Sequence, residues 1–244
     1  CPPAHAQLFR AYLAVNGNDA NPCTLPAPCR LLPAALHAVA DGGEIWMLDS
    51  ANYNTSTVTI ERSVTVLAVP GVLGSVVANG GAAVEITKEG IAVTLRNLSI
   101  RPLAGSDVYD GVRFLAGASL FVQDVAIHDF GGGRGLVATA TGHLTIVDSV
   151  FRANAWGLVV AGPGTIARAV RSHFSLSGVA AGAIAEVAGA TPSLTVERCV
   201  AAGNDWGFIA ESHVKDATSR LVVNESVMSA NRNAGAGAAV LDVL

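Results

Sequence analysis

The chain has 244 residues, of which 51% are hydrophobic, 14% are charged and only 5% are aromatic. Its formal net charge of −4 argues against a nucleic-acid-binding protein, which needs a basic face. A membrane span is not expected either, because even the Ala-rich stretch 178–190 contains Glu186 and no window reaches roughly 18 uncharged apolar residues.

The first six residues carry a processing signal. Ala4, His5 and Ala6 form an A-x-A pattern like the end of a secretory signal peptide, although an Ala-rich N-terminus gives the same letters by chance. Removal of such a peptide would make this a secreted, periplasmic or cell-surface protein. Cys1 precedes the pattern and has no assigned role.

Cys23 and Cys29 bracket the proline-containing stretch CTLPAPC. A disulfide could close this tight loop, and disulfides form in oxidising compartments. The spacing does not fit a metal site. We therefore predict a Cys23–Cys29 bridge, which agrees with export.

The next element is a short helix over residues 28–39, whose apolar side chains fall on one face. Pro33 is tolerated within the first helical turn. The letters DGG end the helix, and EIWMLD, starting at Glu44, begins the first predicted strand.

The sequence then repeats itself with a period of 23–27 residues, and a loose period of this length is typical of a solenoid. Each repeat alternates apolar and polar residues over short stretches, and its glycines and asparagines do not suit helices. The aligned small or apolar residues of successive repeats are Leu98, Val125, Ser149, Ser172, Cys199 and Ser226.

These patterns predict an all-β fold, a right-handed parallel β-helix over residues 44–244. Residues 1–43 form an N-terminal segment with the disulfide loop and the helix, all in one structural domain. We expect the helix to cap the solenoid, because an uncovered end would expose the core and open sheet edges.

Stacking of repeats would place aligned residues in columns. Asn154, Asn204 and Asn231 fall at one turn, where asparagine tolerates left-handed backbone angles and its amide satisfies turn groups. Gly157 and its equivalents begin the following strand, where we expect a sharp bend. Cys199 is predicted to be a buried free thiol.

The stretch 16–66 resembles the opening of a family of bacterial secreted right-handed β-helix proteins in the pectin-lyase-like superfamily. That family has a D-x-NPC…PC loop, a capping helix and a GGEI…LD…Y…VTI…SVTI run. The resemblance implies the fold and export, and it implies no activity because the family is uncharacterised. Matching residues include Asp19, Asn21, Pro22, Cys23, Pro28, Cys29, Gly42, Gly43, Glu44, Ile45, Leu48, Asp49, Tyr53 and Ile60.

The superfamily includes pectate lyases and polygalacturonases, so carboxylates and bases that share a column are candidate site residues. Asp124 and Asp148 should lie one coil apart, with Arg171 next, which could form a carboxylate pair beside a base. The same column could equally be a charge ladder in which Asp148 pairs with Arg171 and Arg198 pairs with Glu225.

A second column contains Arg101, His128, Arg152 and Ser175, with Asp129 next to His128. Stacked basic side chains repel one another unless an anion intervenes, so this column could hold an anionic sugar. The alternative is a row of solvated turn residues. A loop pair, Asp107 and Asp110, has weak potential to bind Ca²⁺.

Trp156 and Trp206 both emerge just before a strand, two coils apart. They are candidate ligand-binding residues, since flat aromatic faces suit sugar rings; the alternative is that each indole shields the core. The residues that point outward on the same strands are apolar and could form a covered or self-associating face. They are Val137, Val159, Ile209 and Ala239.

Two functional hypotheses follow. The first is a non-catalytic secreted or envelope-associated solenoid that binds glycans or self-assembles, with no cofactor, no nucleic acid and no membrane span. The alternative is a lyase or glycoside hydrolase acting on an acidic polysaccharide. It would use Asp124, Asp148 and Arg171, or His128 and Arg152, and Ca²⁺ if it is a lyase.

Overall fold

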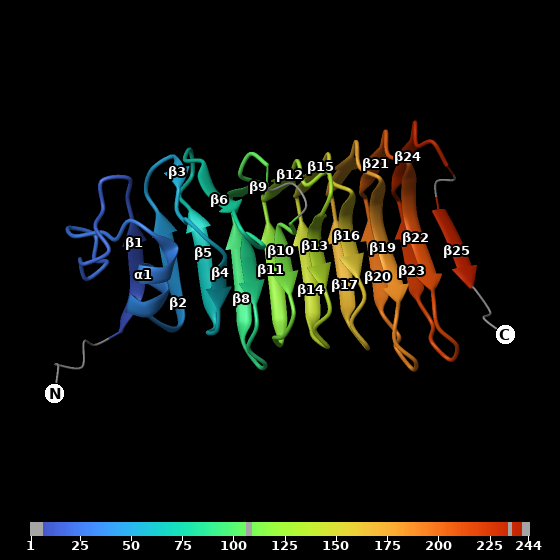
Figure 1. Ribbon diagram of the computed structural model, residues 1–244, viewed down its shortest axis with the longest axis horizontal. Coiled ribbons are helices and arrows are strands. Elements are labelled where there is room, and N and C mark those ends of the chain that lie inside the picture. The colour runs from blue at the N-terminus through green and yellow to red at the C-terminus, as the bar shows by residue number, and fades with distance from the viewer. Residues whose placement is uncertain (1–6, 106–108, 234–235, 241–244) are drawn as a thin grey trace.

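The computed structural model describes residues 7–105, 109–233 and 236–240. Cys1, the A-x-A pattern and Asp107 lie outside the described residues. Over the described part the chain winds into stacked coils, and Figure 1 shows their strands following one another along the long axis of the molecule. The expected right-handed parallel β-helix is confirmed.

Each coil contributes one strand to each of three parallel sheets. Within the described residues, sheet 1 has nine strands, β1 (Leu8–Leu13), β2 (Val39–Met47), β5 (Val64–Ala68), β8 (Ala92–Arg96), β11 (Ser119–Gln123), β14 (His143–Val147), β17 (Ile166–Val170), β20 (Ser193–Glu197) and β23 (Arg220–Asn224).

Sheets 2 and 3 each have eight strands over the same described ranges. Sheet 2 contains β3 (Ala51–Asn52), β6 (Gly74–Ala78), β9 (Leu98–Pro102), β12 (Ala126–His128), β15 (Val150–Arg152), β18 (His173–Ser175), β21 (Val200–Ala202) and β24 (Val227–Ser229). Sheet 3 contains β4 (Val58–Ile60), β7 (Val84–Ile86), β10 (Val112–Phe114), β13 (Arg134–Ala138), β16 (Trp156–Val160), β19 (Val179–Ala185), β22 (Trp206–Ser212) and β25 (Ala236–Val240).

The strand β1 was not expected from the sequence. It lies within the N-terminal segment, pairs in parallel with β2 and extends sheet 1 by one strand. Its partner strand β2 lies about 30 residues later in the chain, beyond the disulfide loop and the helix, so no repeat in the sequence predicts β1.

Helix α1 (Leu32–Ala38) is shorter than the predicted 28–39 and contains Pro33 in its first turn. Its side chains Leu32, Ala35 and Leu36 are buried and belong to the core. Figure 1 shows α1 beside β1 and β2 at the N-terminal end of the stack, where it covers the core as a cap should.

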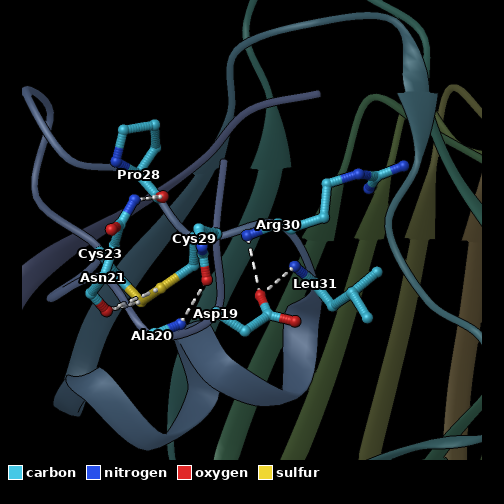
Figure 2. The surroundings of a disulfide bond; sticks show 9 residues. Asp19, Ala20, Asn21, Cys23, Pro28, Cys29, Arg30 and Leu31 are labelled. Atoms are coloured by element: carbon cyan, nitrogen blue, oxygen red, sulfur yellow. Dashed lines mark hydrogen bonds between the residues drawn. A yellow bond between two sulfur atoms is a disulfide. The ribbon is translucent and has the colours of Figure 1, made fainter. Parts of the chain in front are cut away.

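The predicted disulfide between Cys23 and Cys29 is present, with the two Cα atoms 4.6 Å apart. Figure 2 shows how the segment just before this loop is tied to the start of α1: the Asp19 carboxylate accepts hydrogen bonds from the Arg30 and Leu31 amides, both at 2.8 Å. Asp19 therefore fixes Leu31, the residue that precedes the helix.

Sharp corners separate sheet 2 from its neighbours. From β12 onward, one residue with a left-handed backbone precedes each strand of sheet 2 and another follows it. A single left-handed residue redirects the chain from one sheet to the next. The preceding residues are Asp124, Asp148, Arg171, Arg198 and Glu225, and the following ones are Asp129, Ala153, Leu176, Gly203 and Ala230.

A ladder of small polar side chains follows the first corner, in the predicted column. The Ser172 hydroxyl accepts a hydrogen bond from the Ser149 amide (3.2 Å) and donates one to the Val170 carbonyl (3.0 Å). Cys199 takes the next position and repeats these contacts through sulfur, at 3.3 Å to the Ser172 amide and 3.3 Å to the Glu197 carbonyl. It is the buried free thiol that the sequence predicts, and burial raises its pKa.

A second ladder, built on asparagine, follows the corner between sheets 2 and 3. Asn204 accepts a hydrogen bond from the Ser177 amide (2.9 Å) and donates one to the Phe174 carbonyl (3.1 Å). Asn154 makes the same two kinds of contact two coils earlier. The expected role of the amide is confirmed, whereas the expected left-handed backbone is wrong, because the residue before, such as Gly203, adopts it.

Gly157 is needed for a different reason from the one that the sequence suggested. Its φ does not lie in the left-handed region. A Cβ at this position would lie 2.3 Å from the Ala180 carbonyl oxygen of the next coil, so close stacking of neighbouring coils requires the glycine.

Candidate functional site

The outer face of sheet 2 carries a row of basic side chains, which we call the basic row: Arg101, His128 and Arg152. His128 lies opposite Arg152, and continuing the β9–β12 register places Arg101 on the other side of His128. Since neighbouring strands are about 4.8 Å apart, the two arginine positions are about 10 Å apart along the axis. Both arginines are exposed, and neither forms an ion pair with any side chain within the described ranges.

His128 is held on both ring nitrogens. Its Nδ1 lies 2.8 Å from Asp129 Oδ2, and its Nε2 lies 3.3 Å from the hydroxyl of Ser99. Ser99 belongs to β9, one coil earlier, and is buried with 7% of its surface exposed. The contact with Asp129 could be expected from the sequence, whereas the contact with Ser99 could not, because it arises only from the register between coils.

The predicted column of Asp124, Asp148 and Arg171 occupies the first corner of sheet 2. Both carboxylate oxygens of Asp148 accept hydrogen bonds from Arg171, each at 2.7 Å, and this contact holds the pKa of Asp148 below its usual value. Arg198 and Glu225 pair at 2.7 Å further along. These contacts are those of the charge ladder, so a catalytic role for Asp124 and Asp148 stays a prediction.

Trp156 and Trp206 share one row of sheet 3, with Val179 between them. Their environments differ. Trp156 packs against a cluster of apolar residues on the outside of the sheet, whereas Trp206 is 43% exposed. The structure thus places both side chains at the predicted corner, and Trp206 has the more accessible ring.

The apolar residues beneath Trp156 form a stripe on the outer face of sheet 3, separate from the solenoid core. Val137, Val159 and Ile209 align as predicted, whereas Ala239 lies opposite Glu211, because Gly237 takes the position next to Ile209. The side chains of this apolar stripe are only 2–7% exposed. They are Val137, Val159, Ala161, Val179, Ile184 and Ile209.

The same face of sheet 3 carries a closed cluster of charges nearer the N-terminus. The buried carboxylate of Asp110 accepts hydrogen bonds from Arg113 (2.7 Å) and from the guanidinium of Arg134 (2.8 and 2.9 Å), and Arg113 also contacts Glu85 at 3.2 Å. Burial alone would raise the pKa of Asp110, but the two arginines outweigh it and lower the pKa. Asp110 is therefore committed to arginines, which leaves it no free oxygen for the Ca²⁺ that the sequence suggested.

An aromatic cluster at the N-terminal end was not singled out from the sequence. Tyr12 and Trp46 meet edge to face across β1 and β2, with ring centroids 6.3 Å apart. The guanidinium of Arg10 stacks 3.9 Å from the centre of the Trp46 ring and pairs with Glu44. Because Arg10 covers one face of the indole, this cluster is less suited than Trp206 to stacking on a sugar.

The described residues contain no group of three or more histidine, cysteine, aspartate or glutamate side chains that could hold a metal ion. The only helix in that part of the chain, α1, is too short to cross a membrane.

No protein-family model matches the chain, and no curated protein matches it in sequence. Solved structures do match it in shape. A pectate lyase, Pel9A, superposes with a TM-score of 0.55 over 95% of this chain and 82% of its own, at 13% identity. The GH136 lacto-N-biosidase from Eubacterium ramulus superposes with a TM-score of 0.53 over 91% of this chain, at 10% identity, and the chain spans 55% of its length.

These likenesses confirm the pectin-lyase-like β-helix that the sequence analysis expected. At such identities they show the fold alone. The fold is shared with carbohydrate-active enzymes, but a fold does not determine a function. The function of this chain therefore depends on the side chains of its own outer faces.

Proposed function

We propose that this protein is exported and binds an acidic polysaccharide along the outer face of sheet 2. The observation that carries the proposal is the basic row, in which Arg101 and Arg152 flank His128 and have no carboxylate partner among the described side chains. Two exposed like charges about 10 Å apart on one face repel each other, so an anion that bridges them is attracted by both.

The shape of the site favours a polymer over a small molecule. The basic row lies on an exposed sheet face, and its two arginines are about 10 Å apart along the solenoid axis, two strand spacings. A chain of sugars laid along the axis would present carboxylates at regular intervals to such a row. Guanidinium groups bind carboxylates with two parallel hydrogen bonds, which gives geometric specificity.

Trp206 is a candidate for an additional contact. Its ring is 43% exposed and lies on sheet 3, around the corner from sheet 2. We propose that it stacks on a sugar ring, while Trp156 mainly covers the apolar stripe. Replacing each tryptophan with Ala separates these roles. Trp206→Ala should weaken glycan binding with little loss of stability, and Trp156→Ala should lower the melting midpoint.

The Cys23–Cys29 bridge supports export, since such bonds persist in oxidising compartments. Self-association through the apolar stripe is the other function that the sequence suggested. Its side chains are already 2–7% exposed in the single chain, so a second copy would bury little further apolar area there. Cleavage of the glycan by Asp124, Asp148 and Arg171 receives less support, because Asp148 is occupied by Arg171.

The test is a binding titration with polygalacturonate, and with dextran as the neutral control, in affinity electrophoresis or calorimetry. Arg152→Gln should weaken polygalacturonate binding about tenfold, roughly 1.4 kcal/mol, and raising the salt concentration should weaken it further. Arg220→Gln, an exposed arginine on sheet 1, is the matched control and should change little. Equal binding of dextran, or equal loss in both variants, would contradict the proposal.

A further inference from the structure

Ser99, His128 and Asp129 form a connected chain of three side chains on the outer face of sheet 2. Ser99 Oγ lies 3.3 Å from His128 Nε2, and His128 Nδ1 lies 2.8 Å from Asp129 Oδ2. A hydroxyl and a carboxylate thus contact opposite nitrogens of one imidazole. This is the order of groups that activates a serine hydroxyl as a nucleophile.

The hydrogen positions follow from the partners. An ionised carboxylate only accepts hydrogen bonds, so the hydrogen of a neutral His128 ring sits on Nδ1 and points to Asp129. This leaves Nε2 with its lone pair toward the Ser99 hydroxyl, which donates to it. Nε2 is therefore placed to take the hydroxyl proton.

The fold supplies each member from a rigid element. Ser99 and His128 lie on the adjacent strands β9 and β12, whose parallel register brings the two side chains to the same outer face. Asp129 has a left-handed backbone (φ 70°) at the corner that ends β12, and it directs its carboxylate back to the imidazole of its neighbour. Every later coil has a left-handed residue at this corner, so the corner belongs to the fold and the aspartate is particular to this coil.

We propose that these three residues form a catalytic site that hydrolyses carboxylic esters. The Ser99 oxygen attacks the ester carbonyl while His128 takes its proton, and the alcohol leaves with that proton as the C–O bond breaks. Water then attacks the acyl group on Ser99, His128 again moves the proton, and the carboxylic acid is released. The steps consume one ester and one water and need no other reactant.

The surroundings define the substrate class. Ser99 is only 7% exposed, so an acyl group larger than acetyl would be excluded, and we infer a small ester at the end of a protruding alcohol. The arginines on either side of His128 lie on the same face and would supply positive charge that favours the tetrahedral oxyanion formed during the attack. This inference goes beyond glycan binding and stands without it, although an O-acetylated sugar would satisfy both.

The experiment uses the whole chain, a fluorophosphonate probe that labels activated serines, and p-nitrophenyl acetate as the ester. We expect about one probe per chain, mapped to Ser99 by mass spectrometry, and slow release of p-nitrophenol. Ser99→Ala should abolish labelling and bring ester hydrolysis to background. His128→Gln should slow both by about 100-fold, the usual contribution of a general base. Ser75→Ala, the neighbour of Ser99 on β6, is the matched control and should keep both rates.

Asp129→Asn is the positioning variant, since an amide can either accept a hydrogen bond from Nδ1 or donate one to it and therefore no longer fixes the tautomer of His128. It should slow labelling while the melting midpoint stays close to that of the parent, because its side chain is 60% exposed. Absence of probe on Ser99, or labelling that His128→Gln leaves unchanged, would overturn the proposal. Ser99→Ala should still bind polygalacturonate, so loss of esterase activity and loss of glycan binding can be told apart.

Discussion

Two groups of charged side chains lie on neighbouring outer faces of the same coils and are built differently. On sheet 3, the buried carboxylate of Asp110 receives hydrogen bonds from Arg113 and Arg134. On sheet 2, Arg101 and Arg152 are exposed on either side of His128 and have no acidic partner among the described residues. The first cluster is closed, and the second is open.

This difference separates stability from function. Breaking a closed cluster with a buried member destabilises the fold, since removing one charge leaves the others without their partner. An open cluster of like charges stabilises nothing by itself and gains free energy only when an anion arrives. Residues of the two clusters should therefore respond oppositely to mutation, and four expectations make the comparison measurable.

The largest effect is expected in the closed cluster. Asp110→Asn should lower the free energy of unfolding by about 3 kcal/mol, the low end for a broken buried pair, because Arg113 and Arg134 are themselves 37% and 41% exposed. Chemical denaturation measures the loss. Polygalacturonate binding should not change, and a stability within 0.5 kcal/mol of the parent would show that the cluster is not structural.

The contribution of Asp110 should also depend on pH. Its pKa is lowered in the folded state, so its stabilising contribution is present above the unfolded value of about 3.9 and is lost as the pH falls through the folded pKa. The difference in unfolding free energy between the parent and Asp110→Asn should thus be constant from pH 7 to about 5 and shrink below pH 4. A difference that does not change down to pH 2 would contradict this assignment.

The corner that joins the two faces should be next in size. Asn204→Ala removes hydrogen bonds to the Ser177 amide and the Phe174 carbonyl and should cost about 1–3 kcal/mol. Asn224→Ala is the matched control, because that asparagine is exposed at the end of β23. Equal melting midpoints for the two variants would mean that the asparagine ladder carries no stability.

The comparison also shows which parts could be predicted. Coil period, core columns and the Asn and Ser ladders were predictable because each coil repeats the same local requirement: a corner, a side chain that satisfies its backbone, and an inward apolar residue. The strand β1 was not, because its partner strand β2 lies beyond a loop and a helix in the sequence. The left-handed backbone at the Asn corner was misplaced by one residue. Aligning the repeats shows which residues share a column, but it does not show which residue of the turn has the positive φ.

The outer faces were harder to predict. The basic row could be predicted because its members occupy the same position in successive repeats. The contact of His128 with Ser99 could not, because the two residues are 29 positions apart and do not occupy the same position in their strands. Asp110 was grouped with Asp107 by sequence proximity, whereas it binds Arg113 and also Arg134, which lies one coil later and 24 positions away. Side-chain pairs between coils depend on how neighbouring strands are aligned. A single sequence reveals that alignment only at positions where the repeat is recognisable.

The smallest effect on stability is expected in the open cluster, and it tests the comparison most directly. Arg134→Gln removes a partly exposed guanidinium from sheet 3, and Arg152→Gln removes an exposed one from the neighbouring sheet 2. Arg134 donates two hydrogen bonds to a buried carboxylate, so its loss should destabilise the chain by about 1–2 kcal/mol. Arg152 has no acidic partner in the described part of the chain, so its loss should change the free energy of unfolding by less than about 0.5 kcal/mol, with a slight gain from reduced repulsion at low salt. Denaturant titrations of both variants at low and high salt measure these values. If Arg152→Gln destabilised the fold as much as Arg134→Gln, the basic row would be a structural cluster and the argument for a bound anion would fail.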